Sequence, residues 1–371
     1  MIIGCVKEIK NNEFRVGMTP DNVREYVNAG HSVLIETNAG IGSSFLDEEY
    51  VEAGATIIDS AKDVWDQVDM MVKVKEPLPE EYPLFHEGLI LYTYLHLAAD
   101  KEQMDALLKN KIKAVAYETL TEKDGSLPLL TPMSQIAGRL SIQEGAKYLE
   151  KKFGGEGILL AGVPGTHKAN VVILGGGTVG YNACRIAVGI GANVTILDIN
   201  LKRLEELDLL FGSSIQTLYS NDTNIEKAVK NADLVIGAVL IPGKSTPKLL
   251  KRSYLKSMKN GAVYVDVAID QGGCAESARV TTHDDPIYVE EGVVHYCVGN
   301  MPGSVPRTST IALTHATTHY GLMIANKGLE DACRTSDVIA SGVNTYDGQL
   351  TCKNVADSFE GYNYTDIKTL L

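Results

Sequence analysis

The chain has 371 residues, of which 44% are hydrophobic and 22% charged, and these fractions are typical of a soluble globular protein. With 34 Lys and Arg against 47 Asp and Glu, the net charge is −13, which argues against nucleic acid or an anionic membrane as the main partner. No apolar run approaches the roughly 18 residues that span a membrane, the N-terminus shows no secretory signal pattern, and the six cysteines form no CxxC pair, so we expect a cytoplasmic protein with reduced thiols.

The first 130 residues alternate short apolar runs with amphipathic ones. The apolar runs predict strands at residues 1–6, 32–37, 70–75, 89–96 and 113–119. The amphipathic runs predict helices at residues 21–30, 47–55 and 101–110, and the first of these begins at the hydroxyl cap and proline of Thr19-Pro20. Strand–helix alternation of this kind predicts a mainly parallel sheet with helices on its faces.

The rest of the chain opens with a long predicted helix at 134–152 and a loop rich in Gly and Pro. A second alternation predicts strands at residues 170–175, 193–199, 215–220, 233–239, 262–268 and 293–299, and a helix at 308–326. Because one core rarely organises a chain of this length, we expect two domains. We predict an α/β fold in which a doubly wound Rossmann domain, residues 131–305, is inserted into a Rossmann-like α/β domain, residues 1–130 and 306–371. The last part of the tail carries few periodic signals.

The most informative motif lies in the inserted domain. An apolar strand runs into Gly175-x-Gly177-x-x-Gly180, a helical pattern follows, and the next strand ends in Asp198. Gly175 permits a tight turn, Gly177 lets the backbone approach a pyrophosphate, and Gly180 lets the helix pack close to the sheet. Asp198 is placed to accept hydrogen bonds from ribose hydroxyls and to repel a 2′-phosphate. The motif therefore predicts a dinucleotide site that favours NAD over NADP.

Two alternatives to this interpretation stay open. A glycine-rich turn between a strand and a helix would explain the glycines, but it does not explain Asp198. Lys202 and Arg203 follow the acid and would suit a 2′-phosphate, although charges just after a strand usually form a solvated helix face.

Candidate catalytic residues follow the predicted strands of the first domain. Arg15 lies between the first strand and the first helix, Lys75 ends the run MVKVK, and His96 ends LILYTYLH. Ligands of open α/β sheets bind outside the carboxyl ends of the strands, so these three groups are expected to converge on one small anion. Arginine grips a carboxylate with two hydrogen bonds, lysine polarises a carbonyl, and histidine carries a proton near neutral pH. Taken singly, each is better explained as a surface or capping residue, and only their common placement favours a site.

The second domain adds a fourth candidate. Asp270 follows the strand in AVYVDVAIDQGG, whereas Asp266 within that strand is as readily structural. His315 and His319 stand four residues apart on a predicted helix, which is half of a zinc-binding pattern, but no third ligand is evident and we predict no metal.

The chain resembles the L-alanine dehydrogenases over essentially its whole length. The resemblance is strongest in three segments, KEIKNNEFRV, VKVKEP and LLTPMSQIAGRLSIQEGAKYLE. It continues through VVILGGGTVG, VTILDIN, GAVLIPG, VDVAIDQGG, TTHDDP and HYCVGNMPGSVPRTST. Several of these are far more specific than the glycine motif. The C-terminal tail and CAESARV look less typical of the family.

The resemblance implies roles for individual residues. It implies that Arg15 and Lys75 bind the carboxylate and carbonyl of pyruvate, and that His96 carries the proton with help from Asp270. It implies that the inserted domain binds NAD and the other domain binds the substrate. The NAD contacts that the motifs and the resemblance imply are Ser134, Gly175, Gly177, Thr178, Val179, Gly180, Asp198, Arg203, Ser220, Val239, Leu240, Val267, Ala268, Ile269, Arg279, Val298, Gly299, Asn300 and Met301.

The implied reaction is the NAD-dependent, reversible conversion of L-alanine and water to pyruvate and ammonium, in a cytoplasmic homohexamer. Two other enzymatic interpretations remain: the NAD-binding part of a transhydrogenase, and an enzyme that aminates a bulkier 2-oxo acid. A non-catalytic NAD sensor is a third alternative, but it has no need of a complete set of acid, base and carboxylate-binding groups.

Overall fold

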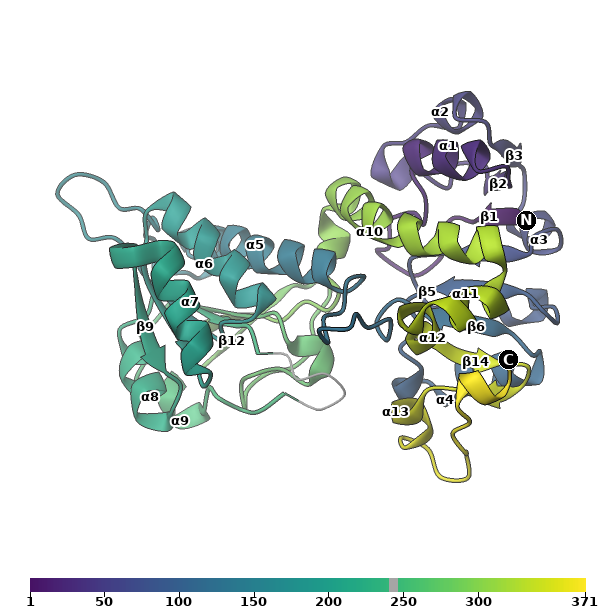
Figure 1. Cartoon of the computed structure of the whole chain (residues 1–371). Coiled ribbons are helices and arrows are strands. Elements are labelled where there is room, and N and C mark those ends of the chain that lie inside the picture. Colours follow the sequence, from purple (N-terminus) through teal and green to yellow (C-terminus); the bar gives the residue numbers. More distant parts are fainter. Residues whose placement is uncertain (240–245) are drawn as a thin grey trace. The chain divides into compact units, whose positions relative to one another are not determined.

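The computed structural model of the chain describes residues 1–239 and 246–371 (Figure 1). The chain divides into two compact units: unit 1 comprises Met1–Met133 and Val305–Leu371, and unit 2 comprises Ser134–Ser304. The boundaries therefore fall at 133/134 and 304/305, rather than at 130/131 and 305/306. The first boundary lies within helix α5 (Thr131–Tyr148), so the chain passes from one unit to the other along a continuous helix.

Unit 1 is built around an eight-stranded sheet with the order β15-β14-β6-β5-β4-β1-β2-β3. The strands from β6 to β3 are parallel, and β14 pairs antiparallel with β6 and β15. The bounds are β1 Ile2–Cys5, β2 Ser32–Glu36, β3 Thr56–Ile58, β4 Met70–Val72, β5 Ile90–Thr93, β6 Lys113–Ala116, β14 Val343–Tyr346 and β15 Gln349–Leu350. Every residue of β4 and β5 is buried, as the continuous apolar runs predict for central parallel strands.

Helices connect and cover these strands, as the alternation predicts. Their bounds are α1 Pro20–Asn28, α2 Asp47–Glu52, α3 Ala61–Trp65, α4 Lys101–Lys109, α10 Pro306–Lys327, α11 Leu329–Thr335, α12 Asp337–Gly342 and α13 Lys353–Ala356. Helix α1 begins where Thr19-Pro20 predicts. The Thr19 hydroxyl accepts from the Asn22 N–H at 3.3 Å, and the Asn22 side chain accepts from the Thr19 N–H at 3.0 Å.

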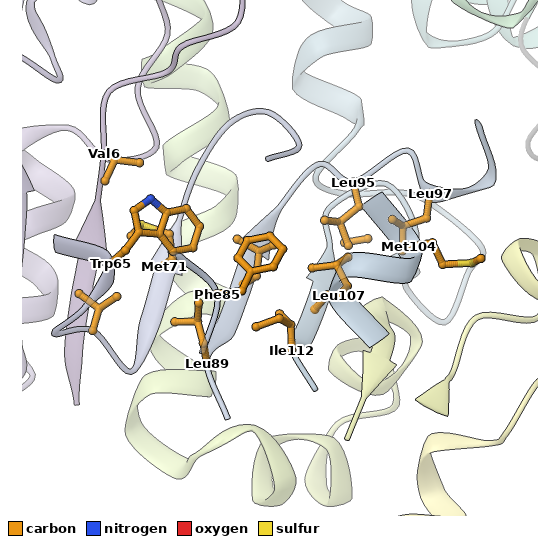
Figure 2. Close-up of a cluster of buried hydrophobic side chains, with 14 of the residues drawn as sticks. Val6, Trp65, Met71, Phe85, Leu89, Leu95, Leu97, Met104, Leu107 and Ile112 are labelled. Carbon is orange, nitrogen blue, oxygen red and sulfur yellow. The ribbon is translucent and has the colours of Figure 1, made fainter. Parts of the chain in front are cut away.

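One apolar cluster of unit 1 includes the residues on either side of His96 in the chain. It gathers side chains from β4, β5, α3, α4 and the loops between them, among them Trp65, Met71, Phe85 and Met104 (Figure 2). Leu95 and Leu97, the neighbours of His96 in the chain, are 0% and 2% exposed and belong to the same cluster. Burial of two leucines of this size contributes roughly 1.5–3 kcal/mol each, so the loop that carries His96 is anchored on both sides of that residue.

Unit 2 is a doubly wound domain with the strand order β12-β13-β11-β10-β7-β8-β9. Its strands are β7 Asn170–Leu174, β8 Asn193–Asp198, β9 Ile215–Tyr219, β10 Leu234–Gly237, β11 Val263–Asp266, β12 Ile287–Glu290 and β13 Val293–Tyr296. Beside α5 its helices are α6 Thr178–Ile190, α7 Leu201–Phe211, α8 Asp222–Lys230 and α9 Arg252–Leu255. The order reverses between β7 and β10, which is the switch point where such sheets bind ligands. The predicted two-domain α/β fold is confirmed.

Several predicted boundaries were wrong. The strand predicted at 70–75 ends at Val72, because the N–H groups of Val74 and Lys75 bond to the side chain of Glu8 rather than to a strand. The strand predicted at 89–96 ends at Thr93. Strands β3, β12, β14 and β15 were not predicted. In β14 the polar side chain of Thr345 is buried and donates to the Ile112 carbonyl at 2.7 Å, which no apolar pattern reveals.

Candidate active site

Three candidate residues of unit 1 lie in loops that follow neighbouring strands. Lys75 comes shortly after β4, His96 comes shortly after β5, and Arg15 lies in the loop between β1 and α1. The three strands are adjacent and parallel, so their carboxyl ends share one edge of the sheet. The structure therefore places Arg15, Lys75 and His96 at the same edge, as the sequence predicts.

The charges at this edge interact. Burial lowers the pKa of Lys75, and the positive charge of Arg15 lowers it further. At the neighbouring Glu76 burial opposes ionisation, but Lys75, a hydrogen bond from Lys10, and His96 together lower the pKa of the carboxyl group. An edge that gathers three cationic or protonatable groups in this way is suited to an anionic substrate.

Arg15 is held in place by a neighbouring carboxylate. Its side chain is 2% exposed, and its Nε and Nη2 donate to the two oxygens of Glu13, each at 2.6 Å. The Arg15 Nη1 lies 3.1 Å from the sulfur of Met133. Burial lowers the pKa of the guanidinium, but the hydrogen bonds and charge of Glu13 outweigh it and raise the pKa above its ordinary value. The paired fork fixes the plane of the guanidinium before any substrate binds.

Lys75 is positioned through its main chain. The Glu8 Oε1 accepts from the N–H groups of Val74 at 2.6 Å and Lys75 at 3.2 Å. The other Glu8 oxygen lies 3.2 Å from the ammonium of Lys73, whose nitrogen is 2.9 Å from Glu81. Lys73 is 0% exposed, so one buried ammonium is shared between two carboxylates. Burial raises the pKa of Glu8 although Lys73 opposes the shift.

His96 adopts a conformation that is rare for a residue with a side chain. Its φ is 52° and its ψ is 32°, in the left-handed helical region, at a cost of roughly 1–2 kcal/mol. The His96 N–H donates to Glu118 at 2.6 Å, and the ring stacks on Tyr94 with centroids 5.9 Å apart and planes 8° from parallel. The imidazole is exposed, whereas the residues on either side of it are buried. Strain of this kind is characteristic of functional positions.

In unit 2 the glycine motif forms the tight turn that it predicts. Gly175 has a φ of +106°, and a Cβ on Gly180 would lie 1.8 Å from the Gly175 carbonyl oxygen. Gly177 differs from both, because its φ is −66° and a Cβ there would meet nothing within 4 Å. The protein's own packing therefore does not require a glycine at 177. A phosphate group approaching the first turn of α6 would require it, so the loop fits a dinucleotide.

Asp198 and Arg203, which follow the motif in the chain, both form hydrogen bonds with the main chain of this loop. Asp198 accepts from the Gly176 N–H at 2.6 Å and from the Asn200 N–H at 2.8 Å. The Nε of Arg203 donates to the Gly176 carbonyl at 2.7 Å, and its Nη1 lies 2.8 Å from Glu206. Arg203 thus bonds to the main chain of the glycine loop and also forms an ion pair with Glu206.

Other predicted cofactor residues lie at the same carboxyl edge of the unit 2 sheet. Ser220 follows β9, and its N–H donates to the Asp198 carbonyl at 3.0 Å. Ser134 lies one turn before Gly138 of α5, where a Cβ would lie 2.3 Å from the carbonyl oxygen of Val179 in the first turn of α6. Val239 follows β10, whereas the predicted contact Leu240 lies outside the residues that the structure describes.

The loops after β11 and β13 lie side by side in unit 2. Asp270 is exposed, and its Oδ2 accepts from the Asn300 N–H at 3.4 Å. These loops carry the remaining predicted contacts, Val267, Ala268, Ile269, Val298, Gly299 and Met301. Asp266 is buried at the base of the first loop, where it accepts from the N–H groups of Ala268 at 3.1 Å and Cys274 at 2.8 Å. Its role is structural.

Arg279 lies further along the segment between β11 and β12. The Arg279 guanidinium lies 3.9 Å from the ring centroid of Tyr288 in β12. His315 and His319 are both exposed on α10. Within residues 1–239 and 246–371, no group of three or more His, Cys, Asp or Glu side chains is arranged to hold a metal ion.

Comparisons with known proteins point to one family. Residues 4–137 match the model described as alanine dehydrogenase/PNT, N-terminal domain, and residues 141–353 match alanine dehydrogenase/PNT, C-terminal domain. Alanine dehydrogenase 2 of Staphylococcus aureus strain USA300 is 56% identical over 361 residues, which are 97% of each chain. The chain belongs to the alanine dehydrogenase/PNT family. The resemblance to L-alanine dehydrogenases is thereby confirmed.

Further relatives of this alanine dehydrogenase/PNT chain agree. Alanine dehydrogenase of Staphylococcus epidermidis is 55% identical, and the alignment covers all of both chains. A solved structure named L-alanine dehydrogenase matches with a TM-score of 0.95 and 53% identity, over 97% of this chain and 99% of that one. A transhydrogenase from Sinorhizobium meliloti matches with a TM-score of 0.81 over 95% and 99% of the two chains, but at 22% identity it shows the shared fold alone.

Sequence reasoning missed the residues that position the candidate groups in this alanine dehydrogenase/PNT chain. Glu8, Glu13 and Lys73 lie within the quoted motifs and Glu118 lies in the strand predicted at 113–119, yet none was singled out. The only available signal was their place next to a strand end, which exposed surface charges share. No helix in the part of the chain that the structure describes is long and apolar enough to cross a membrane.

Proposed function

We propose that the chain is an NAD-dependent L-alanine dehydrogenase, which converts L-alanine, NAD and water reversibly to pyruvate, ammonium, NADH and a proton. The observation that carries the proposal is the gathering of Arg15, Lys75 and His96 at one sheet edge, in a chain 56% identical over 97% of its length to an alanine dehydrogenase. From the same family resemblance we propose that the chain acts in L-alanine catabolism as a cytoplasmic homohexamer.

Arg15 and Lys75 are proposed to hold the substrate. The guanidinium, fixed by Glu13, offers planar donors to the carboxylate, and the ammonium of Lys75 anchors the same end of the substrate or polarises the carbonyl of pyruvate. Arg15 is buried and Lys75 is partly buried, so their attraction for a carboxylate is less screened by water than at an exposed site. Binding at two points orients the α-carbon and supplies much of the rate advantage.

His96 is proposed to carry the protons, with Asp270 assisting. When bound, NAD accepts the hydride that leaves the α-carbon of alanine. As water adds to the resulting imine, His96 takes a proton from it. The same imidazole then delivers that proton to the nitrogen, so that ammonia departs as the carbonyl of pyruvate forms. The exposed ring and its fixed main chain suit a group that must exchange protons repeatedly.

NAD rather than NADP is the proposed cofactor. Gly177 leaves open space at the first turn of α6 for a pyrophosphate, with Thr178 and Val179 next in the chain. Asp198 puts a negative charge where a 2′-phosphate would lie, and Arg203 is paired with Glu206. We propose that unit 2 is the NAD-binding domain and unit 1 the substrate domain.

The test is the formation of NADH by the purified protein with NAD and a panel of L-amino acids, with NADP and D-alanine as controls. Turnover of L-alanine with NAD supports the proposal. Turnover of only a bulkier amino acid would indicate a different 2-oxo acid. Binding of NADH without turnover of any amino acid would refute it. The His96→Ala variant should bind NADH normally and lose about 100- to 10,000-fold in turnover.

A further inference from the structure

One carboxylate, that of Glu118, accepts from the main-chain N–H groups of two consecutive residues, Leu95 and His96. Leu95 N–H lies 3.2 and 3.3 Å from the two oxygens of Glu118, and the His96 N–H donates to Oε1 at 2.6 Å. Glu118 comes just after β6, the neighbour of β5, and Thr93 at the end of β5 is in register with Ala116 at the end of β6. Parallel pairing thus brings the carboxylate to the His96 loop.

The His96 loop needs such a partner. The backbone of His96 is left-handed, with a φ of 52°, and it lies between two leucines whose side chains are fixed in the apolar cluster (Figure 2). The left-handed turn lets both leucines stay buried while the imidazole remains exposed beside Tyr94. A left-handed histidine is unfavourable in itself, and both the burial of the two leucines and a charge-assisted hydrogen bond to its N–H offset that cost.

We propose that Glu118 is a positioning residue for His96. It holds the turn that aims the imidazole, and it acts on the reaction only through that ring. The proposal rests on the proposed function, because it assigns Glu118 to the proton transfers of the same site. A small displacement of a proton carrier costs up to about 100-fold in rate, so removal of the carboxylate should lower kcat without weakening the binding of substrate or cofactor.

The first experiment compares Glu118→Ala with Glu118→Gln and a control, Glu122→Gln. The control removes another carboxylate of the same region, one that accepts from Tyr320. We expect kcat to fall about 10- to 100-fold in Glu118→Ala and less in Glu118→Gln, which keeps one acceptor oxygen. The KM for pyruvate and the Kd for NADH should stay within about twofold, and the control should match the wild type. An unchanged kcat in Glu118→Ala would overturn the proposal.

A double-mutant cycle separates positioning from a general structural role. In the His96→Ala background there is no imidazole to aim, so adding Glu118→Ala should cause no further loss of turnover. If instead the two losses multiply, Glu118 does not act through His96 and the proposal is wrong. Glu118→Gln serves in the same cycle if the alanine variant does not fold.

The outcome for Glu118 is distinct from the outcome for the proposed function. If the wild type converts L-alanine and Glu118→Ala does so equally well, the function stands and the positioning role fails. If the wild type converts no amino acid, the function fails, and the crystal structure of Glu118→Ala, which has no acceptor oxygen at this position, still tests the positioning claim. In that structure His96 should leave the left-handed region, and a φ that stays near its wild-type value would refute the claim.

Discussion

The two units prepare their candidate sites by different physical means. In unit 1 the loops are held by buried charges: Glu13 grips Arg15, and Lys73 is shared between Glu8 and Glu81. In unit 2 the glycine loop is shaped mainly by its glycines and by hydrogen bonds to its main chain. The stability of unit 1 should therefore be sensitive to the loss of a charge, whereas unit 2 should be sensitive to the addition of a methyl group.

The largest expected effect comes from the buried charges of unit 1. Lys73→Met leaves the Glu8 and Glu81 carboxylates facing each other without a cation, so we expect the free energy of unfolding to fall by about 3–5 kcal/mol. Burial already raises the pKa of Glu8 in the folded protein. The folded state of the variant therefore binds more protons than the unfolded state. Its free energy of unfolding should fall further as the pH rises from the ordinary pKa of Glu8 in the unfolded chain to the raised pKa of Glu8 in the folded protein.

Denaturant unfolding at a series of pH values measures this effect. Lys62→Met is the matched control, because that lysine is 65% exposed and pairs with an exposed Asp66. We expect no measurable change in the control at any pH. Equal stabilities for the two variants would show that the buried ammonium does not hold the loop of Lys75, and the contrast between the units would then fail.

The second prediction concerns two glycines of unit 2 that the sequence motif treats alike. A Cβ at Gly180 meets the Gly175 carbonyl oxygen at 1.8 Å, so Gly180→Ala should lower the free energy of unfolding by about 1–3 kcal/mol and also weaken NADH binding. A Cβ at Gly177 meets nothing within 4 Å. Gly177→Ala should therefore cost less than about 1 kcal/mol, the price of a poorer helix cap, yet weaken NADH binding at least as strongly.

Thermal unfolding and NADH titration of the two variants separate these effects. Stability and binding should be lost together in Gly180→Ala, and binding alone in Gly177→Ala. If Gly177→Ala binds NADH like the wild type, the open space at the first turn of α6 is not a phosphate site. If Gly177→Ala loses stability but binds NADH normally, the protein's own packing, rather than a ligand, requires that glycine.

The same contrast explains how much the sequence could predict. The Gly175 turn and the placement of Asp198 follow from local geometry that only certain residues permit, so a motif reveals them. Arg15, Lys75 and His96 were singled out as candidates because each follows an apolar run that predicts a strand, and their roles stay proposals. Glu8 and Glu118 were not singled out, since a glutamate that accepts from main-chain N–H groups looks the same in sequence as one exposed to solvent. Their partners are set by which strands become neighbours, and no local pattern records that.

The smallest predicted effect is a shift in pH dependence at Lys75. Burial and then Arg15 lower the pKa of its ammonium below the ordinary 10.5. In the proposed role of Lys75 the charged form binds the substrate carboxylate, so the KM for pyruvate should rise with pH at values where an ordinary lysine is still charged. The folded protein binds fewer protons here than the unfolded one, so this group makes stability rise with pH over the same range.

Steady-state kinetics of Lys75→Arg provide the comparison, because a guanidinium stays charged throughout this range. The variant's KM differs in absolute value, since arginine does not replace lysine closely, but the alkaline rise in KM should disappear. An identical alkaline rise in both proteins would assign it to another group and remove Lys75 from substrate binding. Disappearance of the rise would mean that burial and Arg15 destabilise the charged form of Lys75 in the free protein and that a bound substrate carboxylate stabilises it. The glycine loop of unit 2 is shaped by main-chain geometry and offers no comparable effect.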